Sequence, residues 1–385
     1  MKKTNNLLRL LVAALFLIGI FAACEGPEGP VGAKGDKGDK GDKGDPGDPG
    51  TSFVNWEGFA EGIVCAACHN PDYDTVYYVW GRKYQWDLSK HAFGGDFERN
   101  SNQCSNCHTT EGYMQMINGQ TVTSHINGSP PGCFSCHAPH SRADFSLRTV
   151  EPVTILSAVA GVPDYVFDYG KGNQCVSCHK TRSLSTKPDP TKTAATDTIT
   201  ITTPRWYPHY GVQGQMLAGV GGFEFQGKTY TNSFHQFSTV IKDEGCIICH
   251  MADAPAGGGI GGGHTMNIEY LNTSGNPTYL LTGCTVAGCH ATSGFTIDYK
   301  QSQTKTHQLL DSLYTLLTPP IRNWINPATG LVNASSSNPL KIAPAYLSGA
   351  LFNFYFIEHD LSFGSHNTQY AQQLLEHSIE VLTAP

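Results

Sequence analysis

The pentapeptide CFSCH, residues 133–137, places two cysteines three positions apart and a histidine directly after the second. Cysteines at positions i and i+3 lie on one side of a helical turn, so both can form thioethers to the vinyl groups of one porphyrin. The following histidine then lies beneath the ring as the proximal iron ligand. C-x-x-C-H is therefore the attachment signature of c-type haem, although C-x-x-C alone also serves zinc and thiol redox sites.

The same pattern occurs five times in the chain. The five copies are CAACH (65–69), CSNCH (104–108), CFSCH (133–137), CVSCH (175–179) and CIICH (246–250). They predict attachment through Cys65, Cys68, Cys104, Cys107, Cys133, Cys136, Cys175, Cys178, Cys246 and Cys249, with His69, His108, His137, His179 and His250 as proximal ligands. Structural zinc and disulfides are the alternatives, but zinc ribbons would not require a histidine after every cysteine pair.

The stretch CTVAGCH, residues 284–290, has four residues between its cysteines instead of two. Once the five motifs and Cys24 are assigned, Cys284 and Cys289 are the cysteines that remain. A disulfide between them is one interpretation. We favour a sixth haem with His290 as proximal ligand, because Gly288 lets the longer loop fold back. The cysteine count then predicts six covalently bound haem c groups.

The N-terminal segment predicts export. Residues 1–23 have a basic start at Lys2 and Lys3 and then an apolar stretch, which is typical of a secretory signal peptide. A transmembrane helix is the alternative, although the segment is short for one. FAAC (21–24) resembles the lipobox of bacterial lipoproteins, which would make Cys24 the lipidated N-terminus. We expect a lipid-anchored protein of the outer membrane, exposed at the cell surface.

Residues 26–50 carry glycine at every third position, nine times in succession. This is the collagen pattern, in which only glycine fits at the axis of a triple helix. A homotrimer through this stalk and a flexible charged spacer are the two interpretations. Either form could extend roughly 75 Å at about 3.1 Å per residue. The expected organisation is a signal peptide (1–23), anchor and stalk (24–52), a hexahaem region (53–300) and a C-terminal helical region (301–385).

The globular part predicts a mainly α fold with much irregular coil. The segments between motifs are short, so we expect the covalently bound haems to form the core. Residues 185–204 predict a surface loop followed by a short β-hairpin or strand. Apolar periodicity predicts three helices near the C-terminus, over 306–317, 345–360 and 367–382, with Asn367 as the N-cap of the last.

The histidines outnumber the proximal positions. Of 16 histidines in the chain, ten follow no cysteine: His91, His125, His140, His209, His235, His264, His307, His359, His366 and His377. This surplus favours bis-histidine ligation over ligation by Met216, Met251 or Met266. His140 lies too close to His137 to clamp the same iron, so it should ligate a neighbouring haem. His307 and His377 lie off the apolar faces of their helices and should face solvent, and His125 and His359 are ambiguous.

Several stretches resemble the multihaem cytochrome c superfamily that includes the pentahaem cytochrome c nitrite reductases. These are WDLSKHA (86–92), CFSCHAPH (133–140), CIICHMA (246–252) with GGHT (262–265), and the closing segment from Phe352 to Leu382. The motif with a longer loop between its cysteines also occurs among multihaem cytochromes. The resemblance implies that His366 is a distal haem ligand, and that His91, His140, His209, His235 and His264 are too.

One departure from that family bears on activity. Its catalytic haem is typically attached through C-x-x-C-K with an open coordination site, and this chain has no such motif. We therefore expect a bis-histidine electron carrier that exchanges electrons with redox partner proteins or an extracellular acceptor. The alternatives are a reductase of small nitrogen or sulfur oxyanions and a haem-wire filament subunit. The formal net charge of −7 argues against nucleic acid as a partner.

Overall fold

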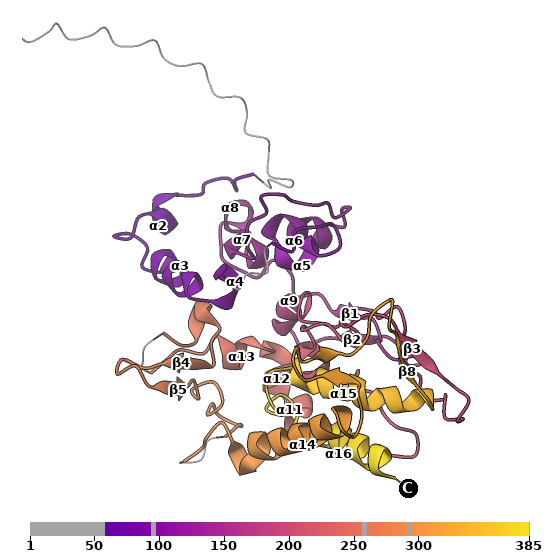
Figure 1. Ribbon diagram of the computed structural model, residues 1–385. Helices are drawn as coiled ribbons and strands as arrows, with labels where there is room; N and C mark the ends of the chain where they lie inside the picture. Colours follow the sequence, from indigo (N-terminus) through magenta and orange to yellow (C-terminus); the bar gives the residue numbers. More distant parts are fainter. Residues whose placement is uncertain (1–57, 94–97, 256–259, 291–293, 385) are drawn as a thin grey trace, which may run out of the picture. The chain divides into compact units, whose positions relative to one another are not determined.

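The computed structural model describes residues 58–93, 98–255, 260–290 and 294–384 (Figure 1). The chain divides into two units, 1–51 and 52–385, and all of the described residues belong to the second. The expectations for Cys24 and for the glycine-repeat stalk lie outside the described residues. In the described ranges, no helix is both long enough and apolar enough to cross a membrane.

Short helices carry the five C-x-x-C-H motifs. Each has four or five residues, enough to place the motif's cysteines on one turn. They are α2 (Ala66–His69), α5 (Ser105–His108), α7 (Cys133–Cys136), α9 (Gly172–Val176) and α13 (Ile247–His250). The expected α fold with much irregular coil is confirmed at this level, because long irregular segments connect these turns (Figure 1).

Further short helices lie between the motifs. They are α3 (Val79–Asp87), α4 (Lys90–Phe93), α6 (Thr110–Ile117), α8 (Pro139–Arg142), α10 (Gln213–Ala218), α11 (Phe234–Phe237) and α12 (Thr239–Glu244). Single 3-10 turns are η1 (Gly263–Thr265), η2 (Tyr299–Gln301) and η3 (Ala345–Leu347). These elements are too short to be stable alone, so their packing partners must hold them.

Within the described residues, the strands form four separate antiparallel pairs. They are β1 (Val153–Ile155) with β2 (Tyr165–Phe167), β3 (Ile199–Ile201) with β8 (Leu340–Ile342), β4 (Glu269–Leu271) with β5 (Pro277–Tyr279), and β6 (Ile325–Asn326) with β7 (Leu331–Val332). The strand expected before residue 204 is present as β3. It does not form a hairpin, because its partner is β8, far along the chain.

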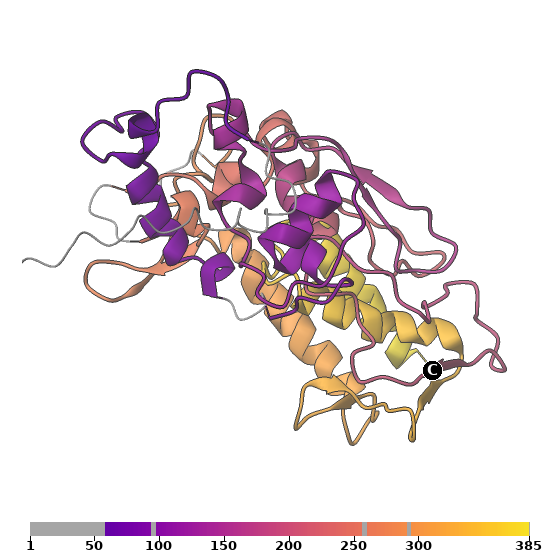
Figure 2. The ribbon, with the colours of Figure 1, turned by 90° about the horizontal axis from the view of Figure 1, so that it is seen from above.

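Three longer helices form the C-terminal region: α14 (Ser302–Leu317), α15 (Ser348–Glu358) and α16 (Thr368–Thr383). They pack on one another, as the two views show in orange and yellow (Figures 1 and 2). All three expected helices are confirmed, although α14 begins four residues earlier than expected. Asn367 is the N-cap of α16, because its side chain accepts a hydrogen bond from the Tyr370 backbone N–H.

An apolar protein core lies beneath these helices. The cluster includes the fully buried Trp206, Phe223, Phe352 and Phe356 and joins residues 158–225 to residues 310–382. The sequence interpretation did not anticipate this core. Ala158, Val159 and the long segment between motifs four and five reach across to the C-terminal helices, so this part of the chain has an apolar core of its own.

Candidate haem-binding site

The six motif histidines each face one other histidine across a short gap. In every pair the second ring belongs to one of the six distal ligands expected from the sequence. The ring centroids are separated by 6.1 Å for His69–His140, 6.0 Å for His91–His179, 6.1 Å for His108–His209, 6.2 Å for His137–His264, 6.3 Å for His250–His366 and 5.8 Å for His235–His290. We number the sites 1 to 6 by the order of their motifs along the chain.

These separations suit an iron midway between the two rings. A histidine nitrogen binds a metal at about 2.0 Å, so two axial nitrogens are about 4 Å apart and the ring centroids are roughly 6 Å apart. Among the described residues, no group of three or more His, Cys, Asp or Glu side chains could hold a metal ion. The histidines come together in twos, which is the number of axial positions that a porphyrin leaves on its iron. The residues present therefore fit a bis-histidine haem.

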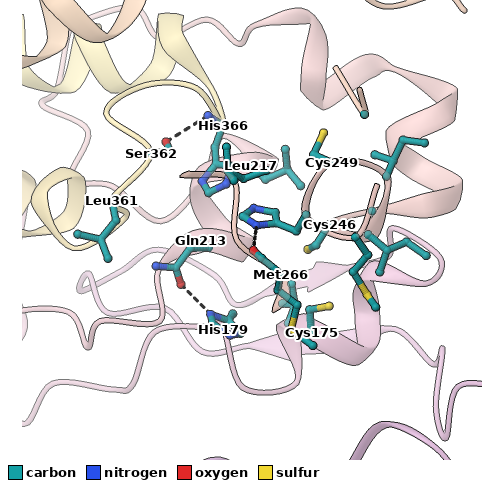
Figure 3. Close-up of a pocket in the computed structure, with 18 of the residues that line it drawn as sticks. Cys175, His179, Gln213, Leu217, Cys246, Cys249, Met266, Leu361, Ser362 and His366 are labelled. Atoms are coloured by element: carbon teal, nitrogen blue, oxygen red, sulfur yellow. Dashed lines mark hydrogen bonds between the residues drawn. The ribbon is translucent and has the colours of Figure 1, made fainter. Parts of the chain in front are cut away.

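Hydrogen bonds at Nδ1 orient several of these rings. The acceptors are Ser146 O for His137 (3.2 Å), Gln213 Oε1 for His179 (3.1 Å), His366 O for His235 (3.2 Å), Met266 O for His250 (3.1 Å) and Asp360 Oδ1 for His366 (2.7 Å). A ring that donates from Nδ1 keeps its lone pair on Nε2, the nitrogen that then binds metal. Figure 3 shows His366 and His179 in the pocket with Cys175 of motif four and with Cys246 and Cys249 of motif five.

Burial keeps most of these rings neutral. Burial is the main cause that lowers the pKa of His91, His250 and His264 to about 4. Burial also lowers the pKa of His179 and His235. Neutral imidazole is the form that binds a metal, so these environments favour ligation at neutral pH.

His125 and His359 are engaged by the protein itself. His125 Nε2 lies 3.0 Å from Gln115 Oε1. His359 is buried, with Nδ1 3.2 Å from Pro208 O and Nε2 3.0 Å from the Glu358 carboxylate. Because these contacts occupy Nε2 in both rings, the structure places the two ambiguous histidines in packing roles.

His307 and His377 also lie apart from the six pairs. His307 is exposed and its ring lies 4.0 Å from that of Phe363, as expected for a histidine off the apolar face. The expectation of solvent exposure is wrong for His377, whose side chain is only 20% exposed. Its Nε2 contacts Thr229 O at 3.2 Å and its ring packs on Tyr230, because the 229–230 segment covers this face of α16.

One continuous cavity of about 1970 Å³ connects sites 2 to 6. Its walls include the cysteines and both histidines of each of these five sites. Its lining comes from five motifs, from α14 and from the 360–372 segment. The cysteine pairs and histidines of these five sites therefore share one interior space.

The sixth motif closes in the same way as the other five. In each C-x-x-C-H motif the histidine N–H donates to the carbonyl of the first cysteine, over 2.8–3.2 Å. In CTVAGCH, His290 N–H donates to Cys284 O at 2.9 Å despite the two additional residues. Gly288 has φ +85°, which returns the loop as expected. Cys284 and Cys289 are both free thiols in the structure.

Sites 4 and 5 are joined by a close glycine contact. A Cβ on Gly172, before motif four, would lie 2.8 Å from the Cα of Gly245, before motif five. The Lys171 N–H donates to Asp243 O at 3.1 Å in the same contact. Since side chains would separate these two backbones, the glycines bring the two motifs together.

Sites 5 and 6 are in contact in a similar way. A Cβ on Gly283, directly before motif six, would lie 2.8 Å from the Cα of Cys249. The turn that carries the sixth motif therefore packs directly on the fifth.

The remaining sites connect through side chains. The Cys178 thiol of site 4 donates to Asn106 O of site 2 at 3.9 Å, and Gln174 Nε2 donates to Ser135 O of site 3 at 3.3 Å. Site 1 joins site 3 because its second histidine, His140, lies three residues after His137, the last residue of the third motif.

Comparisons with known proteins are sparse. No family model matches the chain, and no curated protein matches it. A solved structure with a similar arrangement is described as the outer cell wall cytochrome OcwA, with a TM-score of 0.43 and 17% sequence identity. The match covers 78% of this chain and 50% of that one, so the aligned part spans half the length of the other protein.

Sequence reasoning missed the residues that hold the paired histidines in place. Asp360, which is buried, and Gln213 accept hydrogen bonds from His366 and His179. Gln85 Oε1 accepts from the backbone N–H of His264 at 3.0 Å and so fixes the loop at that histidine. Asp360 precedes His366 by six residues in HDLSFGSH, and a carboxylate near an expected ligand is the one signal that could have identified it.

Proposed function

We propose that this protein is a hexahaem c-type cytochrome that transfers electrons along a chain of bis-histidine haems. The observation that carries the proposal is the pairing of all six motif histidines with six others at 5.8–6.3 Å between ring centroids. In this assignment the proximal ligands are His69, His108, His137, His179, His250 and His290. The distal ligands are His140, His209, His264, His91, His366 and His235, in the same order of sites.

The bound haems supply one-electron redox chemistry, and the chain supplies their position. The cysteine pairs would hold each haem to its turn, and the paired histidines would hold its iron. Hydrogen bonds at Nδ1 hold the rings of His179 and His250 so that little rearrangement accompanies a change of charge. A ligand set that is filled on both sides favours electron transfer over binding of a substrate to the iron.

We infer the order of the sites from the contacts between motifs. Site 1 adjoins site 3, site 3 adjoins site 4, and the glycine contacts continue the series through site 5 to site 6. Site 2 joins the series beside site 4, through Cys178 and Asn106. The proposed route therefore runs 1–3–4–5–6 with site 2 as a branch, and electrons enter or leave at sites 1, 2 and 6.

The proposed location is the outer surface of the outer membrane. The signal peptide, the lipid anchor at Cys24 and the stalk of residues 26–50 support it from the sequence. The stalk would hold the cytochrome away from the membrane, where redox proteins or an extracellular acceptor can reach it. A chain of sites that ends at sites 1 and 6 also suits assembly into a filament.

Haem stoichiometry is the first test. The intact mass of the mature protein should show six haems and no disulfide, and the electron paramagnetic resonance spectrum of the oxidised protein should show low-spin iron at every site. Five haems with a Cys284–Cys289 disulfide would contradict the sixth site. One high-spin haem in the wild type would favour the oxyanion reductase.

A pair of histidines in the C-terminal region tests the ligand assignment. His366→Ala should leave one iron five-coordinate, high-spin and able to bind carbon monoxide when reduced, while all six haems stay attached. His377→Ala is the matched control, because His377 contacts Thr229 and Glu380 and faces no motif histidine. If both variants keep six low-spin haems, His366 is not a ligand.

A further inference from the structure

A buried carboxylate contacts one of the six proposed ligand pairs. Asp360 Oδ1 lies 2.7 Å from His366 Nδ1, and the Asp360 side chain is only 1% exposed. The second carboxylate oxygen accepts a hydrogen bond from the Ser362 hydroxyl. Both residues lie in the segment between α15 and α16, so the rigid C-terminal helices position the carboxylate.

The acceptors at the other oriented rings are neutral. They are the backbone carbonyls of Ser146, His366 and Met266 and the amide oxygen of Gln213. Across the same site, His250 donates to the neutral Met266 carbonyl. Site 5 therefore has one ligand with a neutral partner and one with a charged partner.

A carboxylate on the far side of a metal-bound histidine makes the imidazole a stronger electron donor. Stronger donation favours ferric over ferrous iron, so the reduction potential of the haem falls. The negative charge acts in the same direction, and it acts strongly because it is buried away from water.

We infer that Asp360 acts through His366 and holds site 5 at a lower reduction potential than a neutral hydrogen-bond partner would. The inference rests on the proposed function, because it requires haem between His250 and His366. Site 5 lies between sites 4 and 6 on the proposed route. A low-potential site in that place would pass electrons on without retaining them.

The test is Asp360→Asn in the haem-loaded protein, followed by a redox titration monitored by electron paramagnetic resonance. Asparagine keeps the shape and an acceptor oxygen but removes the charge. One low-spin ferric signal should move to higher potential, and it should be the signal that His366→Ala abolishes. The other five haems should keep their potentials, and all six should remain low-spin.

Two further variants complete the test. Glu358→Gln is the matched control, because Glu358 also pairs with a histidine, His359, at 3.0 Å, but that histidine faces no motif histidine. It should leave all six potentials unchanged. Ser362→Ala removes the hydroxyl that donates to the carboxylate, so the site 5 signal should move to lower potential with its iron still low-spin. The same hydroxyl accepts from the His366 backbone N–H at 3.2 Å, so a high-spin iron in this variant would mean that Ser362 holds the ligand in place. This second variant also serves if Asp360→Asn does not fold.

Three results would overturn the inference. They are unchanged potentials in Asp360→Asn with no downward shift in Ser362→Ala, an equal shift of all six haems, and a high-spin iron in Asp360→Asn. The last would mean that Asp360 holds the ligand in place and does not tune it. Failure of the proposed function is distinguishable, because the wild type itself would then lack six low-spin haems.

Discussion

Residues 58–152 and the C-terminal helices are stabilised in different ways. Among the described residues of 58–152, which carry three motifs, the buried apolar side chains are Tyr113 and Ala138. By contrast, α15 buries ten consecutive residues, from Ser348 to Ile357, and packs against α14 and α16. The characteristic side chains of residues 58–152 are the cysteines and histidines of the motifs, whereas those of the C-terminal helices are buried phenylalanines and leucines.

This difference indicates where the free energy of folding comes from. Burial of apolar surface is the main favourable contribution in an ordinary domain, at about 25 cal/mol per Å². Residues 58–152 bury little of it by themselves, so covalently bound porphyrins are the partners that could supply an apolar interior there. The C-terminal helices have an interior of their own and present His366 to site 5 from a rigid support.

The largest effect is expected when haem is not attached. In protein made without haem attachment, residues 58–152 should lose protection from hydrogen exchange, because almost no apolar side chain is buried there. Residues 302–383 should keep a protected set of amides in α15 and α16. Hydrogen exchange measured by mass spectrometry on both forms checks this. If both regions lost protection from hydrogen exchange to the same extent, or both kept it, the two regions would not differ in how they are stabilised.

A substitution in the apolar core should have the next largest effect. Phe352 is fully buried and its ring stacks on that of Phe356 with centroids 6.0 Å apart. Phe352→Ala should lower the free energy of unfolding by about 3–5 kcal/mol, since it removes buried surface and leaves a cavity. Thermal unfolding followed by circular dichroism measures the loss.

The matched substitution lies in residues 58–152. Ile126 is 89% exposed, so Ile126→Ala should change the free energy of unfolding by less than about 0.5 kcal/mol. The haem count of both variants should stay at six. A Phe352→Ala protein as stable as Ile126→Ala would show that the C-terminal core contributes little.

The features predicted from the sequence were those with a local cause. Each C-x-x-C-H turn depends on five consecutive residues. Helix α16 depends on a repeating apolar face and on an N-cap. The longer loop of the sixth motif depends on Gly288, whose positive φ lets the loop fold back. Each can be recognised within one stretch of sequence, because the physical reason lies in neighbouring residues.

The pairings of histidines and of strands could not be predicted from neighbouring residues in this way. His140 faces His69 and β3 pairs with β8 because of contacts between segments far apart in the chain. The role of Asp360 also depends on how the segment after α15 folds back toward motif five. Sequence reasoning could list candidate distal ligands, but only the three-dimensional arrangement assigns each to a site.

A glycine in the sixth motif should show how far local backbone conformation controls haem attachment. Gly288 has φ +85° with no atom near the place of a Cβ, so Gly288→Ala adds only backbone strain of about 1–2 kcal/mol. We expect a mixture of six-haem and five-haem protein in the intact mass. Gly294→Ala is the control, with φ +84° and equally open space but outside the motif. A five-haem fraction in both variants would exclude a specific role for Gly288.

The smallest expected effect compares one helix cap from the C-terminal region with one from the haem-binding region. The Asn367 side chain caps α16 and also accepts a hydrogen bond from Ser233 N–H at 2.8 Å, whereas the Ser238 hydroxyl caps the six-residue α12. Asn367→Ala should cost about 1–2 kcal/mol of unfolding free energy. Ser238→Ala should cost less, because attachment of the next motif to haem would hold α12 whether or not it is capped. Chemical denaturation of the two haem-loaded variants measures both values, and both should keep six low-spin haems. If Ser238→Ala costs as much as Asn367→Ala, ordinary helix stability matters equally in both regions, and covalent haem does not replace it.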